Sequence, residues 1–151
     1  MLGEAGARNY GGGKTIGDGA MKWFAKQKPA DIWDETIEGP LGDIEAAERI
    51  RNICRSAADS AAQAVRLADN GKASAQKKQK LESDRYERAA KTAMEIAMKM
   101  SDELMRDAAV REIVDLCLTA NNVRTAKILF RAIQSPSIRD MVLRDHPDLR
   151  R

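Results

Sequence analysis

Two cysteines and one histidine are the residues of this chain best suited to nucleophilic or metal chemistry. Cys54, Cys117 and His146 lie far apart in sequence, and the cysteines form no C-x-x-C pair. A zinc site needs several such ligands, and a Cys–His nucleophile needs a histidine held rigidly beside the thiol. His146 stands between Asp145 and Pro147 near the end of the chain, where we expect it to be solvated. Both cysteines fall on the apolar side of predicted helices, so we expect buried thiols, no metal, no cofactor and no catalytic residue.

A glycine-rich stretch near the N-terminus offers a second kind of chemistry. Residues 8–15 read RNYGGGKT, and the final GKT matches the end of a nucleotide-binding P-loop. That loop requires a glycine where Arg8 stands, a buried strand before it and a helix after it. No strand pattern precedes the motif, and Gly17 and Gly19 interrupt the segment where the helix would have to begin. The stretch therefore does not predict nucleotide binding.

The composition favours a helical, non-enzymatic protein. A chain of 151 residues is long enough for one domain with a real core, and 43% of it is hydrophobic but only 4% aromatic. The net charge of +3 is mild and does not by itself imply nucleic acid. The chain has no apolar run of about 18 residues and no apolar leader at its start, so we expect no membrane segment. The free thiols fit a reducing compartment, and we expect a bacterial cytoplasmic protein.

The first 42 residues divide into two segments. Seven glycines make residues 1–20 a predicted flexible tail, because glycine loses the most entropy on ordering. Residues 21–42 form a predicted aromatic arm that carries Trp23, Phe24 and Trp33, with a short helix over about 30–38. The rings either pack over the helical domain or bind a partner, since tryptophan is favoured at binding hot spots.

The remaining residues, 43–151, are predicted to form a single helical domain that opens with a long helix. Asp43 is a suitable N-cap, and Asn70-Gly71 is a suitable end. Between them small residues recur at alternating steps of three and four, which predicts a seam that lets a second helix approach closely. The seam comprises Ala47, Ile50, Cys54, Ala57, Ala61, Ala64 and Ala68.

A second alanine-lined helix is predicted to close an antiparallel hairpin with the first. A polar linker over 72–81 precedes it, and it begins near Ser83. Its seam comprises Tyr86, Ala90, Ala93, Ala97 and Met100. Shorter helices are then predicted over 102–119 with Ser101 as cap, over 123–133, and over 137–144 after Ser135-Pro136. The fold class is therefore all-α: an alanine-rich antiparallel hairpin followed by two or three shorter helices, as a bundle or a short helical-repeat array.

A degraded internal repeat supports the second of these arrangements. Residues 92–111 recur as 125–144, thirty-three positions later. The matched pairs include Thr92 and Thr125, Ala93 and Ala126, Met100 and Ile133, Arg106 and Arg139, and Asp107 and Asp140. A fixed period of this size is typical of stacked helix pairs, which bury their apolar faces against neighbours and offer a surface to the cell.

A spaced apolar pattern covers residues 110–136: Val110, Ile113, Val114 and Cys117, then Ala126-x3-Phe130, then Pro136. In this pattern the segment, less than a quarter of the chain, resembles a tetratricopeptide repeat. The large aromatic residues of that family's first helix are absent here, and one period upstream Lys77 and Lys80 break the pattern. The resemblance implies a protein-binding concave face and no catalysis, and it carries over no functional residue.

Two further groups of residues could contact partners. Met94 and Met98 lie off the predicted seam, so they could line a second groove for a partner helix, although methionine is also common core filler. Basic residues could touch phosphates, but no aromatic residues lie between them to stack on bases. They are Lys72, Lys77, Lys78 and Lys80 near the predicted linker, and Arg124, Lys127, Arg131, Arg139 and Arg144 near the C-terminus.

The function predicted from these patterns is a non-enzymatic protein–protein interaction module, acting as an adaptor, a regulator or an assembly subunit through helical faces and the aromatic arm. A second copy could complete the alanine seam and give a homodimer. The alternative is a nucleic-acid-binding helical module that uses the basic residues of 72–91 and the basic C-terminal helices.

Overall fold

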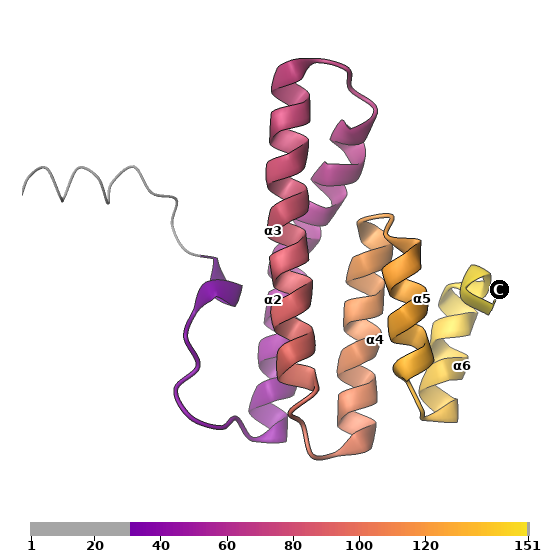
Figure 1. The fold of residues 1–151 in the computed structure, drawn as a ribbon. Helices are drawn as coiled ribbons and strands as arrows, with labels where there is room; N and C mark the ends of the chain where they lie inside the picture. Colours follow the sequence, from indigo (N-terminus) through magenta and orange to yellow (C-terminus); the bar gives the residue numbers. More distant parts are fainter. Residues whose placement is uncertain (1–30, 151) are drawn as a thin grey trace, which may run out of the picture. The chain divides into compact units, whose positions relative to one another are not determined.

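Helices make up the architecture of the chain. The computed structural model describes residues 31–150, and in that range it contains five α-helices, two short 3-10 helices and no strand (Figure 1). In chain order they are η2 (Ile32–Asp34), α2 (Asp43–Ala68), α3 (Ala73–Ala97), α4 (Glu103–Thr119), α5 (Val123–Ala132), α6 (Pro136–Asp145) and η3 (Pro147–Arg150). The all-α prediction is confirmed. The predicted tail, the residues RNYGGGKT, and Trp23 and Phe24 of the arm lie outside the described residues.

The predicted antiparallel hairpin is formed by α2 and α3, which lie side by side (Figure 1). Most of the predicted α2 seam faces inward: Ala57 and Ala61 are fully buried and Ala64 is 7% exposed, whereas Ala47 is half-buried and Ala68, the last residue of the helix, is exposed. Of the predicted α3 seam, Tyr86, Ala93, Ala97 and Met100 are buried, whereas Ala90 is half-buried and its neighbour Ala89 is fully buried in its place. Small side chains on both helices allow the two backbones to pack closely, as the three-and-four spacing predicted.

The predicted polar linker over 72–81 is wrong, because α3 begins at Ala73. Lys72 is the N-cap, and Lys77, Lys78 and Lys80 belong to the first turns of the helix. Alanine, glutamine and lysine all favour helix, and no glycine or proline follows Gly71 to interrupt it. The segment lacks an apolar stripe because this end of the hairpin projects beyond the α4–α5 turn (Figure 1), where it has little to bury.

Two predicted caps are each displaced by one residue. The N-cap of α2 is Gly42, whose amide donates to Glu45 Oε1 at 3.1 Å, and Asp43 is the first helical residue. The N-cap of α4 is Asp102 instead of Ser101, and its Oδ1 accepts from the Met105 amide at 2.8 Å. Because Asp43 is not needed as a cap, its carboxylate is available for another part of the fold.

Asp43 holds the turn between α3 and α4. Its Oδ1 accepts from the Ser101 amide at 2.9 Å, and its Oδ2 accepts from the Asp102 amide at 2.8 Å. Backbone amides at a helix start have no partner within the helix, so a carboxylate is a strong acceptor for them. The start of the first long helix is thereby tied to the start of α4.

Asp107 of α4 holds the turn between α5 and α6 in the same way. Its Oδ2 accepts from the Gln134 amide at 3.0 Å and from the Ser135 amide at 2.8 Å. Gln134 and Ser135 lie thirty-three residues after the two amides that Asp43 holds. The sequence repeat therefore corresponds to two helix–turn–helix units, α3–α4 and α5–α6, whose turns are each held by a carboxylate of an earlier helix.

The turn from α4 to α5 uses two asparagines. Asn121 has a φ of 58°, a left-handed conformation that asparagine tolerates better than most residues. The Asn122 amide donates to the Cys117 carbonyl at 2.8 Å, which satisfies an end carbonyl of α4. Asn122 also caps α5 and donates from Nδ2 to the Tyr86 hydroxyl at 3.1 Å, which joins this turn to α3.

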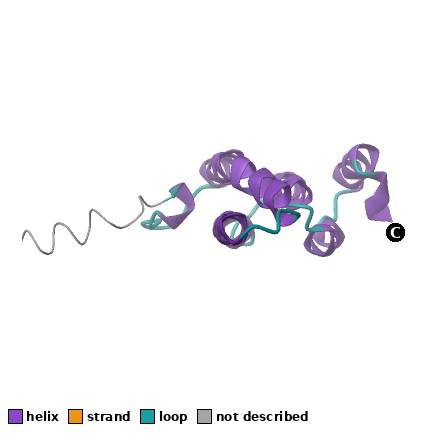
Figure 2. Ribbon diagram, turned by 90° about the horizontal axis from the view of Figure 1, so that it is seen from above, coloured by secondary structure: helices purple, strands orange, loops and turns teal. Residues whose placement is uncertain are grey.

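Helix α4 is the centre of the arrangement and packs against α2, α3, α5 and α6. Figure 2, which views the molecule from above, shows the helices from residue 32 onward as a staggered row, with the C-terminal helices at one end. None of the described helices has the length and apolar character that crossing a lipid bilayer requires.

Candidate functional site

The described end of the predicted aromatic arm forms an extended segment along the hairpin, and we call residues 32–41 the strap. The helix predicted over 30–38 is reduced to the single turn of η2, since so short a segment gains too little to nucleate a longer helix. Trp33 is 4% exposed and belongs to the core, which agrees with the packing alternative for this ring. Gly39, at a φ of 86°, then turns the strap toward α2.

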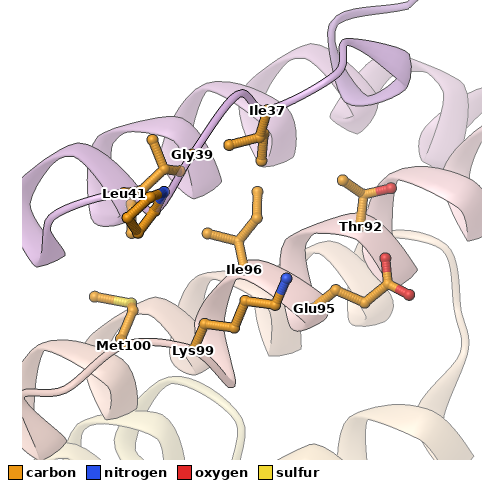
Figure 3. A pocket seen from close by; sticks show the side chains of 10 residues that line it. Ile37, Gly39, Leu41, Thr92, Glu95, Ile96, Lys99 and Met100 are labelled. Atoms are coloured by element: carbon orange, nitrogen blue, oxygen red, sulfur yellow. The ribbon is translucent and has the colours of Figure 1, made fainter.

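Beneath the second half of the strap lies an open pocket of about 380 Å³, which we call the strap pocket (Figure 3). Its apolar walls come from both sides: Figure 3 shows Ile37 and Leu41 of the strap facing Ile96 of α3 across the space. The full lining comprises Ile37, Gly39, Pro40, Leu41, Ala46, Thr92, Glu95, Ile96, Lys99 and Met100.

Polar groups line the α3 side of the strap pocket. Thr92 and Glu95 belong to α3 and Lys99 to the turn that follows it, so the mouth presents a hydroxyl, a carboxylate and an ammonium (Figure 3). Binding sites in proteins are commonly concave, mostly apolar and supplied with a few polar groups that fix orientation. The lining includes no cysteine, histidine or serine, so what these residues offer is binding of an apolar group next to charged ones.

The two predicted partner-binding methionines have different surroundings. Met94 is half-buried and packs against the core, whereas Met98 is 74% exposed at the end of α3. Neither lines the strap pocket. Ile44 of α2 and Leu104 of α4 are also strongly exposed, at 76% and 58%. Both lie close in sequence to the contact between Asp43 and Ser101, so this end of the helices carries several exposed apolar side chains.

The residues considered for nucleophilic chemistry are buried or half-buried. Burial, with a contribution from Glu112, raises the pKa of the Cys54 thiol to about 12, and burial also raises the pKa of Cys117. Both thiols are therefore protonated at neutral pH, and the thiol form is a poor nucleophile. His146 is half-buried and not fully solvated as expected, because its Nε2 lies 3.0 Å from Asp115 Oδ1.

The predicted phosphate-binding lysines gather at the projecting end of the hairpin. Lys72, Lys77, Lys78 and Lys80 are all exposed there. Lys80 Nζ lies 3.7 Å from Asp84 Oδ2, an ordinary pair one turn apart. Within residues 31–150 no three His, Cys, Asp or Glu side chains come together as a metal site would require.

The sequence pattern pointed to Trp33 and Met98, neither of which lines the strap pocket, and gave no sign of the pocket itself. Its walls are ordinary aliphatic residues, and Ile37 is separated from Ile96 by almost sixty positions, so no local pattern joins them. No protein-family model, curated protein or solved structure matches this chain. Its function must be inferred from the geometry of its own residues.

Proposed function

We propose that the chain is a non-enzymatic protein–protein interaction module, and that the strap pocket receives an apolar side chain of its partner. The observation that supports this most is an open pocket with aliphatic walls beside Glu95 and Lys99. Burying one large apolar side chain contributes roughly 1.5–3 kcal/mol, and adjacent charges select the orientation of the partner.

The helix pair formed by α4 and α5 supports the same proposal. Every residue that carries the tetratricopeptide resemblance before Pro136 is buried between helices: Val110, Ile113, Val114, Cys117, Ala126 and Phe130. We propose that the resemblance reflects stacked helix pairs of this general kind, which usually serve as binding scaffolds. A homodimer built on the alanine seam is not part of the proposal, because Ala57 and Ala61 are already fully buried within one chain.

A filled pocket tests the proposal. Thr92→Trp places a large ring at the pocket mouth, and Thr119→Trp, on α4 away from the strap, is the matched control. Proteins from the source organism that crosslink to the wild type and to the control, but not to Thr92→Trp, are the candidate partners. A candidate is then purified and titrated calorimetrically. We expect at least a tenfold loss of affinity for Thr92→Trp alone; equal affinity for the three proteins would contradict the proposal.

One observation favours a second function, the nucleic-acid-binding alternative. The four lysines are exposed near the start of α3, at the end of the hairpin that projects beyond the α4–α5 turn, where a phosphate backbone could reach them (Figure 1). Anisotropy of labelled single-stranded and duplex DNA and RNA, measured at two salt concentrations, tests this function. Binding that weakens with salt and is lost in Lys77→Glu/Lys78→Glu would support it, and no binding at low salt would exclude it.

A further inference from the structure

The first half of the strap occupies a distinct position on α2 and α3, above the strap pocket. Trp33 is buried against both helices, and Arg85 Cζ lies 5.7 Å from the centroid of its ring. Arg85 Nη1 is also 3.3 Å from Glu82 Oε1, an almost buried carboxylate that fixes the guanidinium in place. A guanidinium held over an aromatic ring is a favourable cation–π arrangement. We call this position the aromatic slot.

Two further arginines contact the acidic residues that follow Trp33. Arg88 Nη1 of α3 lies 3.8 Å from Asp34 Oδ1, and Arg49 Nη2 of α2 donates to Glu35 Oε1 at 3.2 Å. Three arginines from two helices thus surround one tryptophan and two carboxylates. Arginine is the residue best suited to both partners, because its planar group pairs with carboxylates and stacks on rings. The surface is complementary to an acidic segment that contains one aromatic residue.

The strap does not use this surface fully. Trp33 Nε1 is buried and donates no hydrogen bond, which costs roughly 1–3 kcal/mol. In the two carboxylate pairs Asp34, Glu35 and Arg88 are exposed and only Arg49 is half-buried, and surface pairs contribute only about 0–1 kcal/mol each. The strap pocket leaves the following residues incompletely packed. A competing segment of similar chemistry could therefore replace the strap at little cost.

We propose that the aromatic slot, with Arg49 and Arg88, recognises an acidic segment with a single aromatic residue in the partner protein, and that residues 33–35 occupy the site in cis as a built-in competitor. This inference rests on the proposed function and names the chemistry of the partner. The partner can bind only while the strap is out of the site. The apparent affinity for the partner is therefore the intrinsic affinity multiplied by the fraction of time that the site is open. Weakening the strap should therefore increase binding in trans.

The test uses the full chain and a fluorescein-labelled peptide with the sequence of residues 31–36, DIWDET. Trp33→Ala empties the slot and leaves its arginines in place. Measured by anisotropy, the peptide should bind Trp33→Ala at least tenfold more tightly than it binds the wild type. A peptide in which alanine replaces the tryptophan should bind neither protein. Equal binding of the DIWDET peptide to the wild type and to Trp33→Ala, or to neither, would overturn the proposal.

A matched pair of variants locates the binding. Added to Trp33→Ala, Arg88→Glu should abolish peptide binding, whereas Lys91→Glu, an exposed change nearby on the same helix, should reduce it less than threefold. If the two substitutions weaken peptide binding equally, the peptide is attracted by the net charge of the surface, and the aromatic slot is not its binding site. Should Trp33→Ala lose its helical circular dichroism, Asp34→Lys/Glu35→Lys weakens the strap while keeping the ring, and the same increase in binding is required.

The outcomes separate this inference from the proposed function. The peptide contains no residue of the strap pocket, so Thr92→Trp should leave its binding unchanged. If Thr92→Trp abolishes partner binding but the peptide never binds, the interaction module stands and the slot proposal fails. If the peptide binds as expected and Thr92→Trp has no effect on any partner, the pocket has been assigned wrongly.

Discussion

Two aspartates at equivalent positions of the repeat have opposite surroundings. Asp107 is 2% exposed and accepts hydrogen bonds from two backbone amides of the α5–α6 turn. Asp140, thirty-three residues later, occupies the same position of α6 and is exposed. No helix pair follows α6 within the described residues, so Asp140 has no corresponding turn to hold. The repeat therefore places an aspartate at both positions, but only Asp107 has a following turn whose backbone amides it can bind.

Asp107→Ala should lower the free energy of unfolding by about 2–3 kcal/mol, because two helix-start amides lose a charged acceptor. Asp140→Ala is the matched control, and a surface change of this kind should stay within about 0.5 kcal/mol. Urea denaturation followed by circular dichroism measures both. Similar losses for the two variants would show that the Asp107 contacts contribute little.

The raised pKa of Cys54 predicts how the stability of the fold changes at alkaline pH. Its pKa is raised from 9.0 to about 12 in the folded chain, so between these values the folded state keeps a proton that the unfolded state has released. Stability from this group is complete below pH 9 and is lost as pH rises toward 12, by roughly 1.4 kcal/mol per pH unit at most. Cys54→Ala should therefore show a shallower loss of stability between pH 9 and 11. Parallel denaturation curves for the two proteins over that range would refute the assignment.

At the scale of elements, the α2–α3 hairpin depends on small side chains. Ala57 is fully buried within the helical core, so Ala57→Leu adds volume where no space exists and should cost about 1–3 kcal/mol. Ala58→Leu is the control on the same helix, since Ala58 is half-buried beside a groove between α2 and α4. In thermal and urea denaturation, the stability of the control should be close to that of the wild type. An Ala57→Leu protein as stable as the control would mean that the hairpin packs loosely.

Apolar spacing predicted the helices well wherever a helix has a neighbour to pack against. The seams of α2 and α3 and the wide apolar stripe of α4 are examples, and Asn121, Pro136 and His146 mark helix ends as expected. The first turns of α3 were missed because they project beyond α4 and bury little, so their helical state leaves no apolar pattern. Helix propensity and the absence of a breaker after Gly71 were the remaining indications.

The candidate sites were less predictable than the helices. Trp33 was identified as an aromatic residue of interest, but its arginine partners come from two helices that follow it by sixteen to fifty-five residues. The role of Asp43 was hidden because its place before the first long helix suited an ordinary N-cap. Long-range pairings of this kind depend on how helices are placed, and spacing within one helix carries no information about them.

At the scale of the whole molecule, contacts between neighbouring helices should make stability uneven along the chain. Helix α4 packs against four other helices, whereas the start of α3 projects beyond the α4–α5 turn, and α6 is the last α-helix of the row (Figures 1 and 2). In arrays of stacked helix pairs, weakly packed ends open without global unfolding.

Native-state hydrogen exchange checks this expectation residue by residue. Amides in the middle of α4 should exchange only through global unfolding, with free energies equal to that from urea denaturation. Amides of residues 72–78 should exchange through local opening at free energies lower by several kcal/mol, since lysine-rich turns with no third helix to cover them can fray independently. Asp107→Ala should then release α6 selectively, because it loosens the α5–α6 turn and leaves the hairpin contacts intact. Uniform protection from α2 to α6, or equal loss of protection in every helix of Asp107→Ala, would show that the chain unfolds as one cooperative bundle and not as stacked helix pairs.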